Sequence, residues 1–300
     1  MAAVSEETAS INGCQLHYQT LGQAHLAGWS HPAVLAMVGH SATLSWWGEL
    51  VPAALAARGF FVILFDHRGT GETRIPNDAA ERQRASEWLA QRGSEGAEEE
   101  TPESLGAPFT FETMADDAVG LLDYLGIERA HIIGRSMSGR IAQVIGVRHP
   151  TRCLSLTLVM TYPRPTLAPE DQAEFARRAA EQAAAGGLST VMEPEDSVED
   201  LITKAQNGAR LTAGDTPPDA TDLEQIAIRV RKDHARGGLD WGGQGSALQS
   251  LATAGWEASV TPAEWAARLA DLTLPTLILH GSQDPLVPVA KGRELHAMIR

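Results

Sequence analysis

The sequence predicts an α/β protein built on a mostly parallel sheet with helices on its faces. Short apolar runs rich in β-branched and aromatic residues each lead into a glycine-containing loop. Helix-like segments separate these runs, and a further run returns near the end of the chain after a long polar stretch. Strands that alternate with helices in this way are typical of βαβ units and a buried parallel sheet.

The predicted elements follow one another along the chain. Strands are expected within residues 32–40, 59–73, 129–139, 153–163 and 274–288. Helices are expected at 46–59 and 110–126, between the early strands, and at 289–300 after the last strand. Open α/β folds bind ligands at the carboxyl edge of the sheet. The loops after these strands are therefore where we expect a functional site.

Two segments interrupt the alternation. Residues 75–106 mix charge, glycine and proline with little apolar periodicity, so we expect a mobile surface insertion with one short helix around Trp88. Residues 164–261 are helical and polar, which predicts a helical cap inserted into the topology of the sheet. The core domain is then expected to consist of residues 1–163 and 262–300.

Composition excludes several classes of function. The chain has 300 residues, of which 43% are hydrophobic, and its formal net charge of −14 would repel nucleic acids and anionic lipid surfaces. No apolar run approaches the roughly 18 residues needed to cross a bilayer, and the first residues do not resemble a secretory signal. The two cysteines, Cys14 and Cys153, suit a reducing cytoplasm and imply neither a disulfide framework nor a metal site. We expect a cytoplasmic protein without nucleic-acid or membrane partners, metal or cofactor.

The stretch "HIIGRSMSGR" places Ser136 directly after a predicted strand. A strand, a sharp turn bearing serine and a helix describe a nucleophile elbow, whose pattern is G-x-S-x-G. Here Gly134 fits the pattern, Ser138 replaces the second glycine, and Gly139 follows one place later. The alternative is an ordinary serine that caps the following helix. The pattern alone is weak, and its context must decide.

Two other loops supply that context. "VGHSATLSWW" follows an early strand, and its position predicts that the main-chain N–H of His40 lies near that of Met137. Two such donors are what the oxyanion of an acyl-transfer reaction requires. "HGSQDPLVP" places Asp284 at the end of a late strand, which is the place of the acid in the chain order Ser, Asp, His.

Taken together, these stretches resemble the α/β-hydrolase family from about residue 12 to residue 300. "VGHSATLSWW", "DHRGTG", "ETMADDAVGLLDYLGIERAHIIGRSMSG" and "DPLVP" are most similar to an esterase-type branch that includes anthracycline methylesterases, cofactor-free haloperoxidase-like proteins and carbon-carbon bond hydrolases. The resemblance implies an α/β-hydrolase fold with a helical cap. It also implies Ser136 as the nucleophile, Asp284 as the acid, and the main-chain N–H groups of Met137 and His40 as oxyanion-hole donors.

The histidine of such a triad is not at its expected place. The resemblance puts it roughly 25 residues after the acid, on the loop after the last strand, yet only 16 residues follow Asp284. The only histidine among them, His296, falls in a predicted helix. Either the sequence lacks its last strand, the histidine loop and the final helix, or the protein has no base. In the second case His40 becomes the candidate base, against the plainer role of a packed loop residue.

For several further residues near the predicted site, the sequence allows two interpretations. Arg135 beside the serine either faces an acidic substrate or takes no part in binding. Trp241 and Trp256, near many glycines, either line a lid over the pocket or form the core of the cap. His67 and Arg68 are expected to brace loops through hydrogen bonds rather than to bind a ligand.

The function that these observations favour is hydrolysis of a carboxylic ester or lactone of a small to medium hydrophobic compound through an acyl-serine. Carbon-carbon bond hydrolysis and haloperoxidase-like chemistry use a similar serine frame and stay open. A second class is a non-catalytic ligand-binding protein that keeps the fold but lacks the base. The sequence gives no indication of the oligomeric state.

Overall fold

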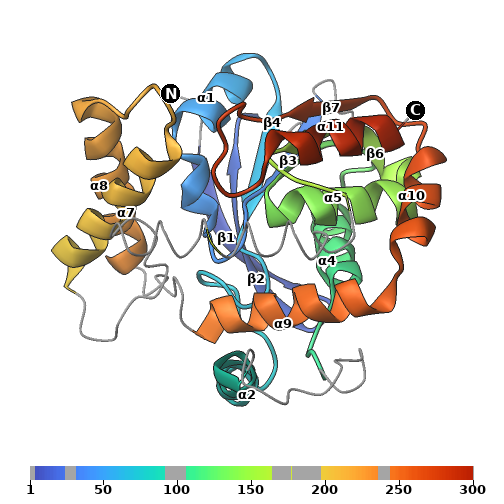
Figure 1. The fold of residues 1–300 in the computed structure, drawn as a ribbon, viewed down its shortest axis with the longest axis horizontal. Coiled ribbons are helices and arrows are strands. Elements are labelled where there is room, and N and C mark those ends of the chain that lie inside the picture. The colour runs from blue at the N-terminus through green and yellow to red at the C-terminus, as the bar shows by residue number, and fades with distance from the viewer. Residues whose placement is uncertain are drawn as a thin grey trace.

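The computed structural model describes residues 4–23, 32–91, 106–163, 177, 197–235 and 244–299. Within these residues the chain forms a seven-stranded sheet of order β1-β2-β4-β3-β5-β6-β7 (Figure 1). The strands are β1 (Val4–Ile11), β2 (Cys14–Leu21), β3 (Ala33–Met37), β4 (Phe61–Phe65), β5 (Ala130–Arg135), β6 (Cys153–Val159) and β7 (Thr276–Leu279). Neighbouring strands from β4 to β7 pair in parallel. The predicted α/β class with a mostly parallel sheet is confirmed.

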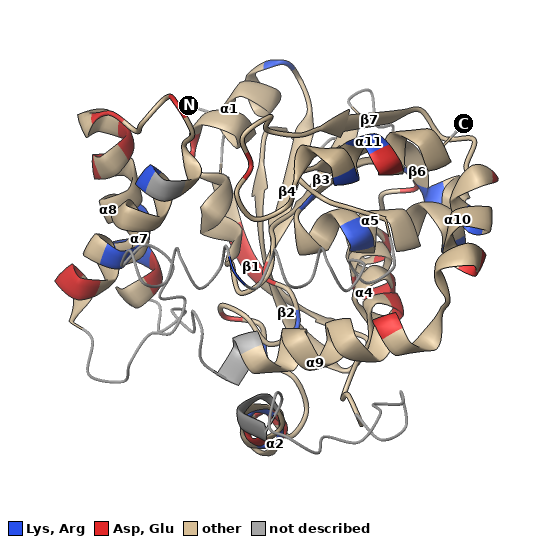
Figure 2. Cartoon of the chain, in the orientation of Figure 1, with Lys and Arg blue, Asp and Glu red and all other residues tan. Residues whose placement is uncertain are grey.

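Helices flank this sheet and connect its strands. They are η1 (Leu44–Trp47), α1 (Leu50–Ala57), α2 (Asp78–Gln91), α4 (Phe111–Tyr124), α5 (Met137–Arg148), η2 (Pro150–Arg152), α7 (Val198–Thr212), α8 (Ala220–Ala235), α9 (Gln244–Ser259), α10 (Pro262–Ala270) and α11 (Val289–Met298). None of the helices in the described ranges is long and apolar enough to cross a membrane. Figure 2 shows that α7 and α8 each carry both acidic and basic residues.

An antiparallel hairpin, β1 and β2, precedes the parallel strands and was not predicted from the sequence. Its turn is Asn12-Gly13, with φ of 47° and 79°. An Asn-Gly pair is the local signal for a hairpin turn in which both central residues have positive φ. The signal is easily missed here, because most residues of β2 are buried and the strand shows little alternation of apolar and polar residues.

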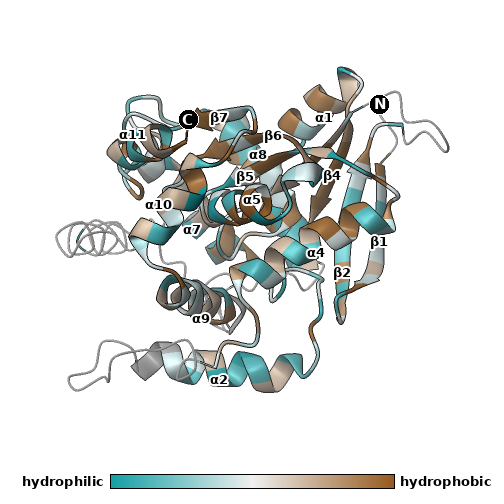
Figure 3. Ribbon diagram, turned by 90° about the vertical axis from the view of Figure 1, so that its right-hand side faces the viewer, coloured by the Kyte–Doolittle hydropathy of each residue, from teal (hydrophilic) through white to brown (hydrophobic). Residues whose placement is uncertain are grey.

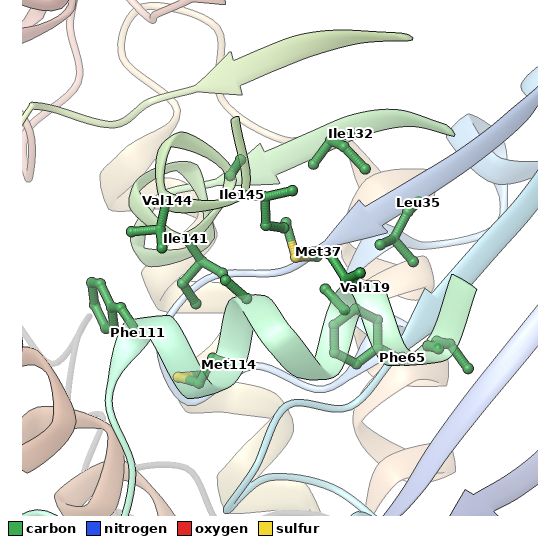
Figure 4. Close-up of a cluster of buried hydrophobic side chains, with 14 of the residues drawn as sticks. Leu35, Met37, Phe65, Phe111, Met114, Val119, Ile132, Ile141, Val144 and Ile145 are labelled. Carbon is green, nitrogen blue, oxygen red and sulfur yellow. The ribbon is translucent and has the colours of Figure 1, made fainter. Parts of the chain in front are cut away.

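Alternate residues of the central strands face different helix layers. Leu35 and Met37 of β3 belong to a large core cluster shared with α4 and α5 (Figure 4). Val34 and Ala36 belong to a second cluster on the opposite face, against which Leu55 of α1 packs. Successive side chains of a strand point to opposite faces, so a sheet covered on both sides requires apolar residues at every position. This is why these strands read as continuous apolar runs.

Helix α9 joins the main core, although the sequence placed it in the cap. Trp256 is fully buried and stacks on Phe111 of α4, with ring centroids 4.9 Å apart. Its other neighbour is Trp265 of α10, at 5.2 Å. An ion pair of 2.7 Å between Arg140 and Glu257 ties α9 to α5. Within the predicted cap, residues 164–261, it is α7 and α8 that form a separate apolar cluster of their own.

The predicted insertion contains a longer helix than expected. Helix α2 spans 14 residues and includes Trp88, and it lies along α9 (Figure 3). Trp88 packs against the main core cluster. The segment 75–91 is therefore ordered around a helix, and residues 92–105 of the predicted insertion lie outside the described residues.

Candidate active site

Ser136 occupies a strained turn between β5 and α5. Its φ and ψ of 55° and −120° are values that L-residues other than glycine seldom adopt. The surrounding backbone fixes the turn: the Ser136 N–H donates to the Val159 carbonyl at 2.9 Å, and its carbonyl accepts from Gly139 N–H at 2.9 Å and from the Thr161 hydroxyl at 2.8 Å. The serine thus stands on a strand-turn-helix elbow at the carboxyl end of the parallel sheet.

Two glycines near Ser136 are required by close packing. A Cβ atom at Gly134 would lie 2.1 Å from the Ser138 carbonyl oxygen. A Cβ atom at Gly139 would lie 2.5 Å from the Thr161 side chain. The glycine of the motif that sits one place late is therefore the one that lets α5 approach β6.

Ser138, which replaces the second glycine of the motif, fills a polar position beneath the elbow. It is fully buried, its hydroxyl donates to the Val38 carbonyl, and that hydroxyl lies 2.7 Å from His67 Nε2. Because Ser138 donates to Val38, it accepts from His67, which must then carry its proton on Nε2. Burial lowers the pKa of His67 to about 3, so the ring is neutral. His67 braces the elbow, although through a serine rather than by a direct bond to a carbonyl.

The loop after β3 approaches Ser136 closely. A Cβ atom at Gly39 would lie 3.0 Å from Ser136 Cβ and 3.5 Å from its Oγ. Ser41, with φ of 59°, donates its N–H to Gln249 Oε1 of α9 at 2.7 Å. Gln249 is fully buried, so it holds the loop from within the protein. The main chain of His40 therefore lies one residue from the point at which this loop meets the serine.

The other oxyanion-hole candidate, Met137, is the first residue of α5. The first N–H groups of a helix have no partner within it and point toward a site of negative charge. Met137 is buried beneath the elbow. Its N–H group and the His40 loop therefore flank the serine from two different elements.

The His40 side chain is turned toward α9. It is exposed, its Nε2 lies 3.1 Å from the Ser250 hydroxyl, and its Nδ1 lies 2.9 Å from the Ser41 hydroxyl. Both ring nitrogens are thus engaged with serines other than Ser136.

Asp284 lies in the loop after β7, two strands away from the elbow. Its Oδ1 accepts the main-chain N–H groups of Leu286 and Val287, each at 2.9 Å. Its Oδ2 lies 3.6 Å from Nε2 of His280, a buried residue that the sequence analysis did not single out. His280 Nε2 is closer to the Val287 carbonyl, at 2.7 Å. His280 and the two main-chain N–H groups thus hold Asp284 and the turn around it.

Neither histidine candidate, His40 or His296, is hydrogen-bonded to the Ser136 hydroxyl. His296 is exposed on α11. In the part of the chain that the structure describes, no hydrogen bond joins a histidine ring to the Ser136 hydroxyl. His25 and His31 lie outside the described residues.

The loop after β4 supports the site from below. Asp66 is buried, and its carboxylate accepts the N–H groups of Leu44 at 2.7 Å and Glu72 at 3.0 Å. Burial raises the pKa of Asp66 to about 6. The next residues of the loop also face inward, because Arg68 pairs with the buried Asp117 of α4. Together these bonds tie the β3 and β4 loops to each other and to the core.

The predicted pocket residues have different surroundings. Arg135 is partly buried at the end of β5, beside Ser136. Trp256 has no exposed surface to offer a ligand, because it packs within the core. Trp241 lies outside the described residues. Glu6, His17 and Glu72 are a group with metal-ligating atoms within 4.8 Å of one another, but none of them belongs to the Ser136 elbow.

Comparison with known proteins identifies the fold family. Residues 31–297 match the family model described as alpha/beta hydrolase fold. The chain belongs to this family. It is 26% identical over 290 residues to 3-oxoadipate enol-lactonase 2 of Acinetobacter baylyi, a match that covers 97% of this chain and 84% of that one. It is 24% identical to a rhodomycin D methylesterase of Streptomyces peucetius, over 88% of this chain and 78% of the methylesterase.

Solved structures of other alpha/beta hydrolases share the fold of this one. The enol-lactonase of Burkholderia xenovorans LB400 is 21% identical, with a TM-score of 0.59, and the match covers 97% of this chain and 87% of the enol-lactonase. The 2-hydroxy-6-oxo-6-phenylhexa-2,4-dienoate hydrolase of a Rhodococcus strain is 22% identical, with a TM-score of 0.63, over 100% and 88% of the two chains. The relatives thus include the methylesterase and carbon-carbon bond hydrolase types that the motifs resemble.

Proposed function

We propose that this hydrolase-fold protein cleaves a carboxylic ester or lactone through an acyl-serine at Ser136. The serine oxygen adds to the carbonyl carbon as its proton passes to an imidazole, and the oxyanion is held by main-chain N–H groups of Met137 and His40. The carbon–oxygen bond to the leaving group then breaks, and the imidazole returns the proton to that oxygen. Water repeats the sequence on the acyl-serine and releases the acid.

The observation that carries the proposal is the conformation of Ser136. A non-glycine residue with positive φ is held there by three backbone and side-chain hydrogen bonds, between a strand and a helix N-terminus. A serine that merely capped the helix would not need this strain, and its side chain makes no cap hydrogen bond. Strain of this kind is kept where it exposes a reacting group.

We infer that the base is an imidazole from outside the described residues and that Asp284 orients it. Asp284 is suited to this role because it lies in the loop after β7, at the same sheet edge, and two main-chain N–H groups fix one of its oxygens. Its other oxygen, which lies 3.6 Å from His280 Nε2, would accept the hydrogen bond of the base.

The substrate class is inferred from the relatives. Enol-lactonases and methylesterases both act on esters, and a small to medium hydrophobic ester or lactone fits both. A cytoplasmic setting is part of the proposal, since Cys14 and Cys153 are unpaired and buried.

One observation favours a second candidate function. No described histidine reaches the Ser136 hydroxyl, so a protein that binds an ester-like ligand without cleaving it would show the same geometry. Turnover of simple esters separates the two functions.

The test uses p-nitrophenyl hexanoate and a six-membered lactone, with the full-length encoded protein, Ser136→Ala, Asp284→Asn and the control Asp271→Asn. Asp271 ends α10 and is exposed, so this control removes an equal charge away from the elbow. Hydrolysis that disappears in Ser136→Ala, falls at least 100-fold in Asp284→Asn and persists in Asp271→Asn is expected. Tight binding of the lactone without turnover would favour the second function instead.

A further inference from the structure

Arg135 is unlike the other buried arginines of the fold. Arg68 is paired with Asp117, and Arg140 is paired with Glu257 at 2.7 Å. The Arg135 guanidinium has no ion pair and no hydrogen bond to any residue that the structure describes. A charge withdrawn from water is costly unless it is paired, so a guanidinium without a pair among the described residues is suited to bind an anionic ligand.

The direction of the Arg135 side chain follows from the register of β5. Ile132 and Ala130 face the large core, whereas His131, Ile133 and Arg135 alternate with them and face the side covered by η1 and α1. Ile133 packs against the cluster on that side. Arg135 is the last residue of this row, so it lies at the carboxyl edge of the sheet, directly before Ser136 in the chain.

A second guanidinium, Arg229 of α8, lies near enough to act on the charge of Arg135. Arg229 lies over the ring of Trp46 in η1, 5.4 Å from its centroid. Helix α8 is fixed on η1 by Asp233, whose Oδ2 accepts the Thr43 hydroxyl at 2.8 Å and the Ser45 hydroxyl at 2.7 Å. Figure 1 shows α8 beside the end of the molecule that carries α1.

The two cations act on each other. Burial and, after it, the charge of Arg229 lower the pKa of Arg135. Arg229 donates its Nε to the Gln225 carbonyl at 3.2 Å; burial lowers its pKa, and the charge of Asp233 on the same helix partly offsets that effect. Two guanidinium groups that repel each other are stabilised together by one anion placed between them.

Because the protein as a whole is negatively charged, an anion binds only where positive side chains are close to it. With a formal net charge of −14, the protein repels anions at a distance. A pair of cations at the entrance of the site reverses that repulsion within a few ångströms, where screening by salt is weak.

We propose that Arg135 and Arg229 bind a carboxylate of the substrate, remote from the ester that Ser136 attacks. The inference rests on the proposed function and refines it: the substrate is an ester or lactone of a carboxylic acid that carries a second, ionised carboxyl group. Arg135 binds the carboxylate through bidentate hydrogen bonds from its planar guanidinium group, and Arg229 adds a second positive charge from α8. The rest of the substrate is apolar.

The test compares two esters of equal acyl length, p-nitrophenyl hydrogen adipate and p-nitrophenyl hexanoate. The wild-type protein is expected to prefer the anionic ester, and Arg135→Gln to reduce the ratio of the two kcat/KM values roughly 10- to 100-fold. Arg229→Gln reduces this ratio less. Arg135→Lys keeps part of the preference, because the positive charge remains while the bidentate guanidinium group is lost. The control Arg148→Gln removes an exposed charge from α5 and leaves the ratio unchanged.

A binding measurement separates this inference from the proposed function. Ser136→Ala is titrated with monomethyl adipate by calorimetry, alone and combined with Arg135→Gln. Affinity that drops at least tenfold in the combined variant supports the carboxylate site even if no ester is hydrolysed. Hydrolysis of both esters with equal kcat/KM, or a ratio that Arg135→Gln does not change, overturns the carboxylate site while the serine hydrolase proposal stands.

Discussion

At the scale of single residues, the elbow depends on the absence of one side chain. A Cβ atom at Gly134 would meet the Ser138 carbonyl oxygen at 2.1 Å, which is backbone and cannot move aside without shifting α5. We expect Gly134→Ala to destabilise the protein by roughly 3 kcal/mol and to lower kcat more than 100-fold. Urea unfolding and ester turnover measure the two effects.

Gly255→Ala is the matched control for that change. Its new Cβ would lie 3.5 Å from Ala107 Cβ, an ordinary contact, within the helix α9. Its stability should rise by up to about 1 kcal/mol, since alanine favours a helix over glycine. Equal stability of the two variants would mean that the elbow is not closely packed.

Restoring the second glycine of the motif should harm this protein. Ser138→Gly removes the hydroxyl that connects His67 Nε2 to the Val38 carbonyl, and leaves both buried groups without a partner. The free energy of unfolding should fall by about 1–3 kcal/mol. Denaturation midpoints check this, and a more stable Ser138→Gly variant would contradict the role assigned to the hydroxyl.

His67 should make stability depend on pH. Its pKa is about 3 in the folded protein, because burial lowers it, and ordinarily about 6.5. Between these values the unfolded chain binds a proton that the folded one does not, so the contribution is complete above pH 6.5 and is lost as the pH falls toward 3. The slope is about 1.4 kcal/mol for each pH unit. Asp66 acts in the opposite direction, because burial raises its pKa to about 6.

A variant isolates the histidine from Asp66. His67→Gln retains an N–H donor for Ser138 but cannot take up a proton. The difference in unfolding free energy between the wild type and this variant should shift in favour of the variant as the pH falls from 6.5 to 5. A difference that is independent of pH would show that His67 is not held neutral.

At the scale of elements, α9 acts as a support for the active-site loop. Gln249 is buried on this helix and accepts the Ser41 N–H at 2.7 Å. Gln249→Leu leaves that donor unpaired, so we expect stability to fall by about 1–3 kcal/mol and kcat/KM to fall roughly tenfold or more, mainly through kcat. Ser250→Ala, which affects only the exposed His40 ring, should change kcat far less. Similar kcat losses in both variants would contradict this role.

The elements that could be predicted are those with a local signal. The strands β3 to β7 are runs of apolar residues before loops that contain glycine or, after β6, proline, and each was placed correctly by that pattern. The helix α9 was assigned to the cap, because its polar and glycine-rich start resembles the cap segment and its partners Phe111 and Trp265 are distant in the sequence. Tertiary packing, not local propensity, decides where such a helix lies.

At the scale of the whole molecule, the site is assembled from loops of four parallel strands. Ser136 and Asp284 were recognisable because each follows a predicted strand and so must lie at one edge of the sheet. The bonds through His67, Gln249 and Ser138 were not, since they join elements separated by 71 to 208 residues. Charge pairing had the same limit, and only the fold shows that the partly buried Arg135 has no acid beside it among the described residues.

The measurement that tests the account most directly is the intact mass of the full-length encoded protein after exposure to a fluorophosphonate, beside Ser136→Ala and the control Ser259→Ala. Ser259 lies at the end of α9 and donates to the Trp256 carbonyl. A single adduct in the wild type and in Ser259→Ala, absent from Ser136→Ala, is the predicted result, because only an activated serine reacts. No adduct on the wild type, or one that persists in Ser136→Ala, would contradict the assignment of Ser136 as the nucleophile.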